Sequence, residues 1–231
     1  DGGRVVWHLG DRLEVDGRLT PLADAPGRHQ YGLTPALPID PAAAPLTDQQ
    51  GRAILAAIEA LGWQGRSDHL HLAGWVVLSN VCGAIPKRPG LQITSRFGSG
   101  KTDLIESVIQ PLQAGIGLSS TGSTEAGIRQ LIGRDALPAT VDESEAEDGN
   151  GKRREAQLRL LRYAYDGAQQ VKGTPAGDPI RFCLRSALAL AGINATIPNP
   201  ADRSRLAVIS RRSLPGDQWA AAIARRDAAI S

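Results

Sequence analysis

The segment TSRFGSGKTDL, residues 94–104, contains the residue types that bind phosphate groups. It follows the pattern G-x-x-x-x-G-K-[ST], with Ser95 in place of the first glycine. In such a turn the backbone N–H groups point at phosphate oxygens, and the positive end of the following helix strengthens the attraction. The predicted phosphate-binding residues are Gly98, Ser99, Gly100, Lys101 and Thr102.

Two of these side chains have distinct predicted roles. Lys101 would neutralise the β- and γ-phosphates of a nucleotide, and the Thr102 hydroxyl would occupy one position around Mg²⁺. The apolar run before Ser95 predicts a strand, and apolar residues at helical spacing after Thr102 predict a helix, which is the context that the pattern requires. The alternative is an ordinary strand-to-helix turn that contains Lys-Thr by chance.

A second acidic position follows 41 residues after Lys101. Asp142 ends a predicted strand, where a carboxylate can hold Mg²⁺, and the adjacent Glu143 is placed to polarise an attacking water. The spacing leaves room for a helix, a strand and another helix, so we expect the Asp142 strand to lie beside the strand before the phosphate loop. The alternative is a solvated acidic loop, because five carboxylates occur in the seven positions from Asp142 onwards.

Two further polar residues belong to predicted strands. Asn194 ends the apolar run ALALAGI, where its amide could hydrogen-bond a γ-phosphate and orient the water beside Glu143; it could equally be a polar strand end. Lys172 lies in VKGTPAGDPIRF, whose turn residues predict a β-hairpin. The hairpin could bring Lys172 to a DNA phosphate, or it could simply be solvated.

Arg203 and Arg205, in the segment ADRSR, precede the last predicted strand. Arginine stabilises the charge that develops on a transferred phosphoryl group, so either residue could act on a nucleotide bound by a neighbouring subunit. Alternatively, both are solvated or pair with Asp202 or Glu143. The sequence does not distinguish between the two arginines.

The composition restricts the class of protein. The 231 residues carry 26 basic and 24 acidic side chains, so any contact with nucleic acid must be local. The two cysteines lie in apolar runs, which is typical of a reducing cytoplasm and favours a cytoplasmic location. The most apolar stretch, residues 72–85, is shorter than the roughly 18 residues of a membrane span, so we expect a buried core helix and no membrane partner.

Alternating strand and helix patterns predict an α/β fold with three layers around a mainly parallel sheet, preceded by a small N-terminal β-hairpin or meander and two helices. We expect three parts: a β-rich segment and linker over residues 1–46, a helical segment packed on the core over 47–85, and a P-loop core with a C-terminal helix over 86–231. The chain begins at Asp1 and contains no methionine, so we expect a fragment of a longer protein.

The ordered motifs TSRFGSGKT, STEAGIRQLIG, TVDESEAED, VKGTPAG, ALAGIN and ADRSRLAV, together with WHLGDRL upstream, resemble the helicase-like ATPase module of prophage and mobile-element primase-helicase proteins. The resemblance spans about residues 3–212 and implies a P-loop core of the AAA+ type, forming a homo-oligomeric ring that translocates on DNA during replication. It implies ATP and Mg²⁺ at Lys101, Thr102 and Asp142. Ser95 and Arg96 depart from the Gly-Pro that is usual in related loops.

The resemblance also implies a role for the remaining candidates. Glu143 would activate the water, Asn194 would act as the sensor, Arg203 or Arg205 would be the arginine finger, and Lys172 would line the pore. The sequence therefore favours a Mg²⁺-dependent ATP hydrolase that moves on single-stranded DNA. The alternatives are a non-hydrolysing, nucleotide-dependent assembly or DNA-loading module and, third, a small-molecule kinase.

Overall fold

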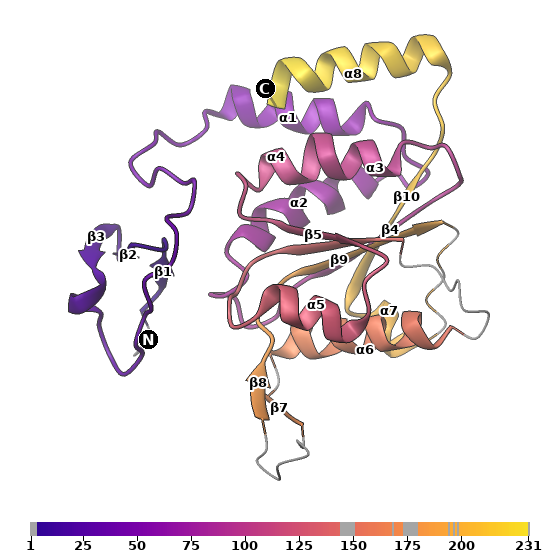
Figure 1. The fold of residues 1–231 in the computed structure, drawn as a ribbon. Coiled ribbons are helices and arrows are strands. Elements are labelled where there is room, and N and C mark those ends of the chain that lie inside the picture. The colour runs from indigo at the N-terminus through magenta and orange to yellow at the C-terminus, as the bar shows by residue number, and fades with distance from the viewer. Residues whose placement is uncertain are drawn as a thin grey trace.

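The computed structural model describes residues 4–143, 151–167, 169–172, 180–193, 195, 197 and 199–230. Its centre is a five-stranded parallel sheet in the order β10-β4-β9-β6-β5 (Figure 1). The strands are β4 (Gly90–Ser95), β5 (Leu118–Thr121), β6 (Ala139–Asp142), β9 (Leu188–Ile193) and β10 (Leu206–Arg211). The expected α/β fold with a mainly parallel sheet is confirmed.

One expectation about the sheet is wrong. Strand β6, which ends at Asp142, does not lie beside β4, because β9 is hydrogen-bonded between them. After β4 the chain crosses to the far edge at β5 and returns through β6 and β9 before it reaches β10 on the other side of β4. Since the strands are parallel, their carboxyl ends still meet along one edge of the sheet. We call this the carboxyl edge and the opposite one the amino edge.

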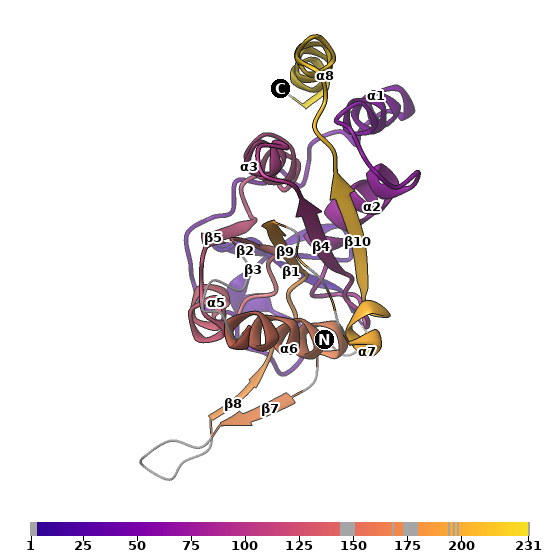
Figure 2. The same cartoon turned by 90° about the vertical axis from the view of Figure 1, so that its right-hand side faces the viewer.

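Helices cover both faces of the sheet (Figure 2). One face carries α1 (Asp48–Glu59), α2 (Asp68–Asn80), the continuous helical segment α3 (Lys101–Leu104), η2 (Ile105–Ile109) and α4 (Gln110–Leu112), and α8 (Gly216–Ile230). The other face carries α5 (Glu125–Ile132), α6 (Lys152–Asp166) and α7 (Pro200–Arg203). Strand β9 serves both cores, with Ala189 and Ala191 facing the first and Leu188 and Leu190 the second. This alternation is what a buried strand in a three-layer fold requires.

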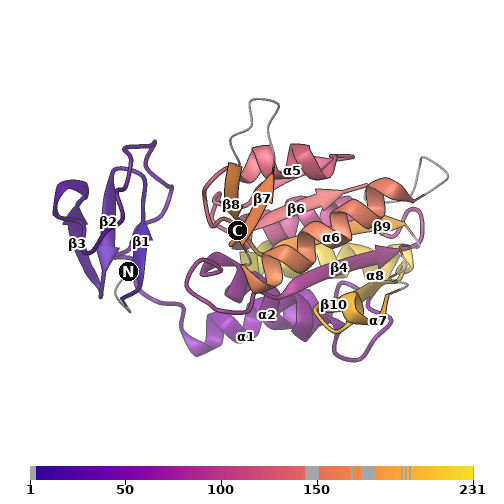
Figure 3. The ribbon, with the colours of Figure 1, turned by 90° about the horizontal axis from the view of Figure 1, so that it is seen from below.

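A small antiparallel sheet and two helices precede the core, as expected. Strands β1 (Val6–His8), β2 (Arg12–Val15) and β3 (Arg18–Pro21) form a meander, followed by the short helix η1 (Leu22–Asp24), and it lies apart from the five-stranded sheet (Figure 3). Asp16 and Gly17 connect β2 to β3 with φ values of 51° and 79°, as a tight hairpin turn demands. Thr47 and Gln50 form the predicted capping box at the start of α1.

The helix predicted to be a buried core helix, α2, is buried on one side. Leu72, Trp75 and Val76 pack in the core, but Val77 is 68% exposed and Leu78 is 43% exposed. Leu131 of α5 is exposed as well. Apolar side chains around a whole helix do not reveal which of them the sheet will cover. None of the helices in the described ranges is both long and apolar enough to span a membrane.

The predicted hairpin is present below the sheet in Figure 1, as β7 (Gln169–Lys172) and β8 (Ile180–Cys183). The two strands are antiparallel, with Lys172 opposite Ile180 at the end that leads into the connecting turn. Both cysteines are free thiols; Cys82 is buried, whereas Cys183 is exposed and does not act as a core residue.

Candidate phosphate-binding site

The phosphate loop follows β4 at the carboxyl edge. Ser95 is the last residue of β4 and pairs with Ile193 of β9 and with Arg211 of β10. It has extended strand backbone, so this position needs no glycine. The positive φ angles fall instead at Gly98 and Gly100, at 73° and 76°. The departure from the sequence pattern therefore lies outside the part of the turn that requires glycine.

The loop leads directly into a helix. Gly100 occupies the N-cap position of α3 and its carbonyl accepts the first helical hydrogen bond, from the Leu104 N–H at 3.0 Å. The helix then widens at η2, where Gln110 donates to the Ile105 carbonyl five residues back, just before Pro111, which has no N–H. The helix continues in α4. Because it begins at Lys101, directly after the loop, the positive end of its dipole faces the loop.

Lys101, Thr102 and Asp142 converge at this edge. The Lys101 Nζ lies 2.8 Å from Asp142 Oδ1, and the Thr102 hydroxyl donates to Asp142 Oδ2 at 3.4 Å. Both members of the ion pair are largely buried, with side chains 10% and 13% exposed. The three groups border a cavity of about 440 Å³ whose other walls are the phosphate loop, Glu143 and Ile193.

Glu143 directly follows β6 and has an unusual backbone conformation. Its φ of 53° is in the left-handed region, which is strained for a residue with a side chain. Its N–H donates to Asp142 Oδ1 at 2.8 Å, and Arg153 of α6 donates to its carbonyl at 3.3 Å. Arg153 thus helps to hold the turn that presents Glu143.

Arg203 and Arg205 lie at the amino edge, away from the loop. Leu206 pairs with Gly90 at the start of β4, whereas Arg211 pairs with Ser95 at its end, a separation of roughly 17 Å for five residue steps. Arg203 donates to the Ile197 carbonyl at 3.1 Å, and the Arg205 guanidinium lies 5.8 Å from the centre of the Tyr165 ring. The phosphate loop of the same chain is out of their reach.

Asp202, which might have paired with these arginines, instead forms an ion pair with Arg162 of α6 at 2.8 Å. Asn194 lies outside the described residues; the described part of β9 ends at Ile193, which borders the cavity. For Lys172 the structure describes the backbone, at the end of β7, and not the side chain.

Sequence reasoning missed Arg211, which ends β10 beside the phosphate loop. It is fully buried, and its guanidinium lies 5.6 Å from the Trp63 ring centre and 5.5 Å from that of Trp219. Burial, opposed by Asp103 and reinforced by Arg226, lowers the pKa of Arg211 to about 10, so the group is charged at neutral pH. The signal was available, because the strand-end rule that singled out Asp142 applies equally to β10.

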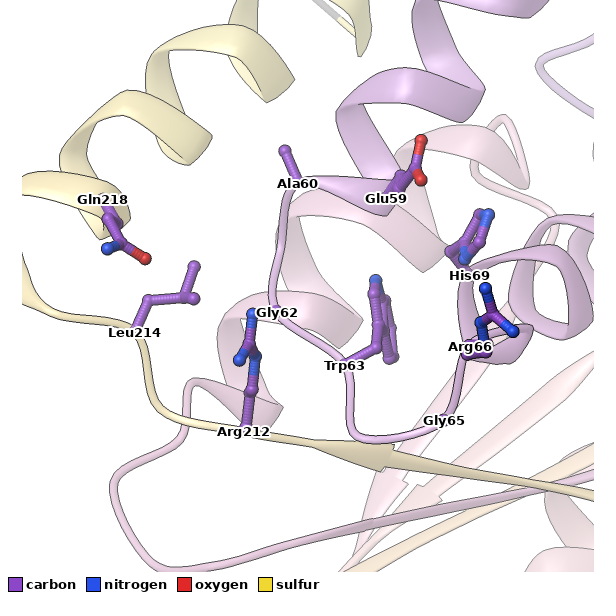
Figure 4. A pocket seen from close by; sticks show the side chains of 10 residues that line it. All are labelled: Glu59, Ala60, Gly62, Trp63, Gly65, Arg66, His69, Arg212, Leu214 and Gln218. Carbon is purple, nitrogen blue, oxygen red and sulfur yellow. The ribbon is translucent and has the colours of Figure 1, made fainter.

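A second cavity, of about 300 Å³, adjoins this region (Figure 4). Figure 4 shows that its side chains come from the end of α1, the loop before α2, the start of α2, the segment after β10 and the start of α8. The lining residues are Glu59, Ala60, Gly62, Trp63, Gly65, Arg66, His69, Arg212, Leu214 and Gln218. Trp63 thus borders this cavity and also contacts Arg211.

Comparison of the sequence with protein-family models and with curated proteins gave no match. Among solved structures, the chain is similar to JCV helicase, with a TM-score of 0.44 and 16% identity over 73% of this chain and 46% of that one. It is also similar to the apo C-terminal region of NrS-1, with a TM-score of 0.47 and 11% identity over 99% of this chain and 65% of that one. The chain thus spans under half the length of the first and about two thirds of the second.

Proposed function

We propose that this chain is a Mg²⁺-dependent ATPase motor domain of a replicative primase-helicase-like protein of the AAA+ type, which moves on single-stranded DNA. The observation that carries the proposal is the meeting of Lys101, Thr102 and Asp142 around a cavity at the carboxyl edge of a parallel sheet. Ligands of open α/β sheets bind outside the carboxyl ends of the strands, where the chain reverses direction across the sheet. Here the chain leaves β4 for the far edge and returns to both sides of it.

The loop residues fit a triphosphate. Positive φ angles at Gly98 and Gly100 turn the backbone so that successive N–H groups can face one anion, and the helix that begins at Lys101 adds its dipole. The Lys101 ammonium already lies beside a carboxylate oxygen and would exchange it for phosphate oxygens. The ion pair with Asp142 thus holds the lysine in the position that a phosphate would need.

The donor atoms also fit Mg²⁺. A hydroxyl and a carboxylate within 3.4 Å of each other are the hard oxygen ligands that this ion takes from proteins, alongside water and substrate phosphates. Thr102 and Asp142 would hold the ion, which when bound neutralises charge on the transferred phosphoryl group. The proposal needs no further acidic ligand.

Glu143 is the candidate for orienting and polarising the attacking water. It is exposed at the cavity, and the Arg153 contact to its carbonyl fixes the direction in which its backbone turns. Asn194 would complete the water site from the end of the neighbouring strand. A general base positioned in this way typically contributes about 10²- to 10⁴-fold to a rate.

The separation of Arg203 and Arg205 from the loop supports hydrolysis between subunits. An arginine finger must reach the phosphoryl group, and a second copy of the chain can present its amino edge where the first copy's own arginines cannot reach. The copies would repeat head to tail, as in a homo-oligomeric ring. The β7–β8 hairpin would carry Lys172 to single-stranded DNA at the centre, in the cytoplasm.

Release of inorganic phosphate from ATP, with and without single-stranded DNA and Mg²⁺, tests the proposal. We expect turnover that needs Mg²⁺, rises with DNA and is absent in Lys101→Ala. Wild-type turnover in Lys101→Ala would exclude the site. ATP that stays bound without phosphate release would favour the assembly module, and transfer of phosphate to a metabolite would favour the kinase.

A further inference from the structure

Arg211 is an unusual buried cation. Its side chain is 0% exposed, and none of its three guanidinium nitrogens has a hydrogen-bond partner among the described residues. A charge removed from water is costly unless another group compensates it. The rings of Trp63 and Trp219 offer partial compensation through cation–π attraction. Aromatic rings carry no net negative charge, so they offset only part of the free-energy cost of burying the charged guanidinium.

Asp103, the carboxylate whose charge acts on Arg211, is already engaged. Both oxygens of Asp103 accept hydrogen bonds from Arg226 of α8, at 2.7 and 2.8 Å, and Arg226 also pairs with the exposed Asp227. Two guanidinium groups therefore share one partly buried carboxylate. Lys101, the lysine of the phosphate loop, is paired with Asp142. Of these three cations, Arg211 is therefore the one whose nitrogens have no paired carboxylate among the described residues.

The guanidinium lies directly behind the phosphate loop. A Cβ atom added to Gly100 would lie 3.4 Å from Arg211 Nη2 and 2.8 Å from Cη2 of Trp219. The Trp219 ring and the guanidinium thus pack against Gly100, and neither side chain lines the cavity. Only glycine leaves room for this contact, and its positive φ adds a second reason for glycine here.

We propose that Arg211 is a positioning residue that supplies buried positive charge to the bound polyphosphate through the loop at Gly100, and so favours nucleotides with more phosphates. This inference rests on the proposed nucleotide site and adds a residue to it. Arg211 does not touch the ligand. It raises the electrostatic potential where the phosphates bind, and the two tryptophans keep water from screening that charge.

The dependence on phosphate number separates a charge effect from a general structural effect. We would measure dissociation constants for AMP, ADP and ATP without metal, by calorimetry, in the wild type, Arg211→Met and Arg211→Lys. In Arg211→Met we expect ATP affinity to fall by about 10- to 100-fold and AMP affinity by less than about threefold. Arg211→Lys keeps the charge and should retain most of the preference for ATP. Arg212→Met is the matched control, because it removes the neighbouring but exposed cation and should leave the preference unchanged.

The possible outcomes distinguish the role of Arg211 from the proposed nucleotide site. Equal losses for AMP and ATP in Arg211→Met, or an unchanged preference, would overturn the role of Arg211. Failure of the wild type to bind ATP would instead reject the proposed function. If Arg211→Met does not fold, Trp219→Ala takes its place, because it admits water to the guanidinium from a half-buried position on α8. The ratio of AMP to ATP dissociation constants should then fall several-fold, and an unchanged ratio would refute the inference.

Discussion

The carboxyl and amino edges of the same sheet are organised differently. At the carboxyl edge, the side chains of Lys101 and Thr102, from a helix, lie within 3.4 Å of the carboxylate of Asp142, which ends a strand. At the amino edge, Arg203 donates to the Ile197 carbonyl, and Arg205 contacts the Ala201 carbonyl and the Tyr165 ring. One chain thus contains a complete candidate site for phosphate and lacks, at that site, the two arginines. One chain should therefore be able to bind ATP by itself, whereas ATP hydrolysis should require two chains.

The largest effect is expected from a substitution at the carboxyl edge. In Lys101→Ala we expect no measurable ATP turnover, because the loop loses the cation that lies beside the cavity in contact with Asp142. Phosphate release and ATP binding would both be measured. Arg52→Ala, which removes an exposed cation from α1, is the control and should behave as the wild type.

The amino edge is tested by removing each arginine in turn. We expect either Arg203→Ala or Arg205→Ala to lower turnover by about 10³-fold with nucleotide affinity unchanged, because an arginine finger acts on the transition state. Each variant is the control for the other. Mixing the inactive one with Lys101→Ala should restore part of the turnover, since the first supplies an intact loop and the second an intact arginine. No recovery in the mixture would argue against sites shared between subunits.

Replacement of Glu143, at the carboxyl edge, distinguishes an effect on ATP hydrolysis from an effect on ATP binding. Glu143→Gln keeps the size of the side chain and removes its charge, so we expect turnover to fall by about 100-fold and ATP affinity to change by less than about threefold. Single-turnover measurements would distinguish the two quantities. An equal loss of binding would show that Glu143 holds the nucleotide and does not activate water.

The smallest effect is expected from removal of the ion pair that stabilises the amino edge. Arg162→Met removes the partner of Asp202, whose side chain is 4% exposed, and should lower the free energy of unfolding by about 2 kcal/mol. ADP affinity should not change, because the phosphate loop lies at the other edge. Urea unfolding and calorimetry measure the two quantities. Arg159→Met, on the exposed side of α6, should change neither; weaker ADP binding in Arg162→Met alone would show that the edges are coupled.

Much of the carboxyl edge could be predicted from the sequence, because its motifs are local. The glycine turn and the helix after it are encoded within ten residues, and Asp142 follows its own strand directly. The order of the strands could not be predicted in this way, since β9 enters between β4 and β6 only through long-range pairing. The burial of Arg211 could not be predicted either, because it depends on how the loop before α2 and helix α8 place Trp63 and Trp219 against β10.

The central claim is that a site formed by one chain is completed by a neighbour. ATP turnover per subunit, followed across a protein concentration series from micromolar to hundreds of micromolar with single-stranded DNA present, tests it most directly. The account predicts that turnover per subunit rises with concentration and levels off as the chains associate. Turnover per subunit that stays constant, at a rate equal to that of the associated protein, would contradict it.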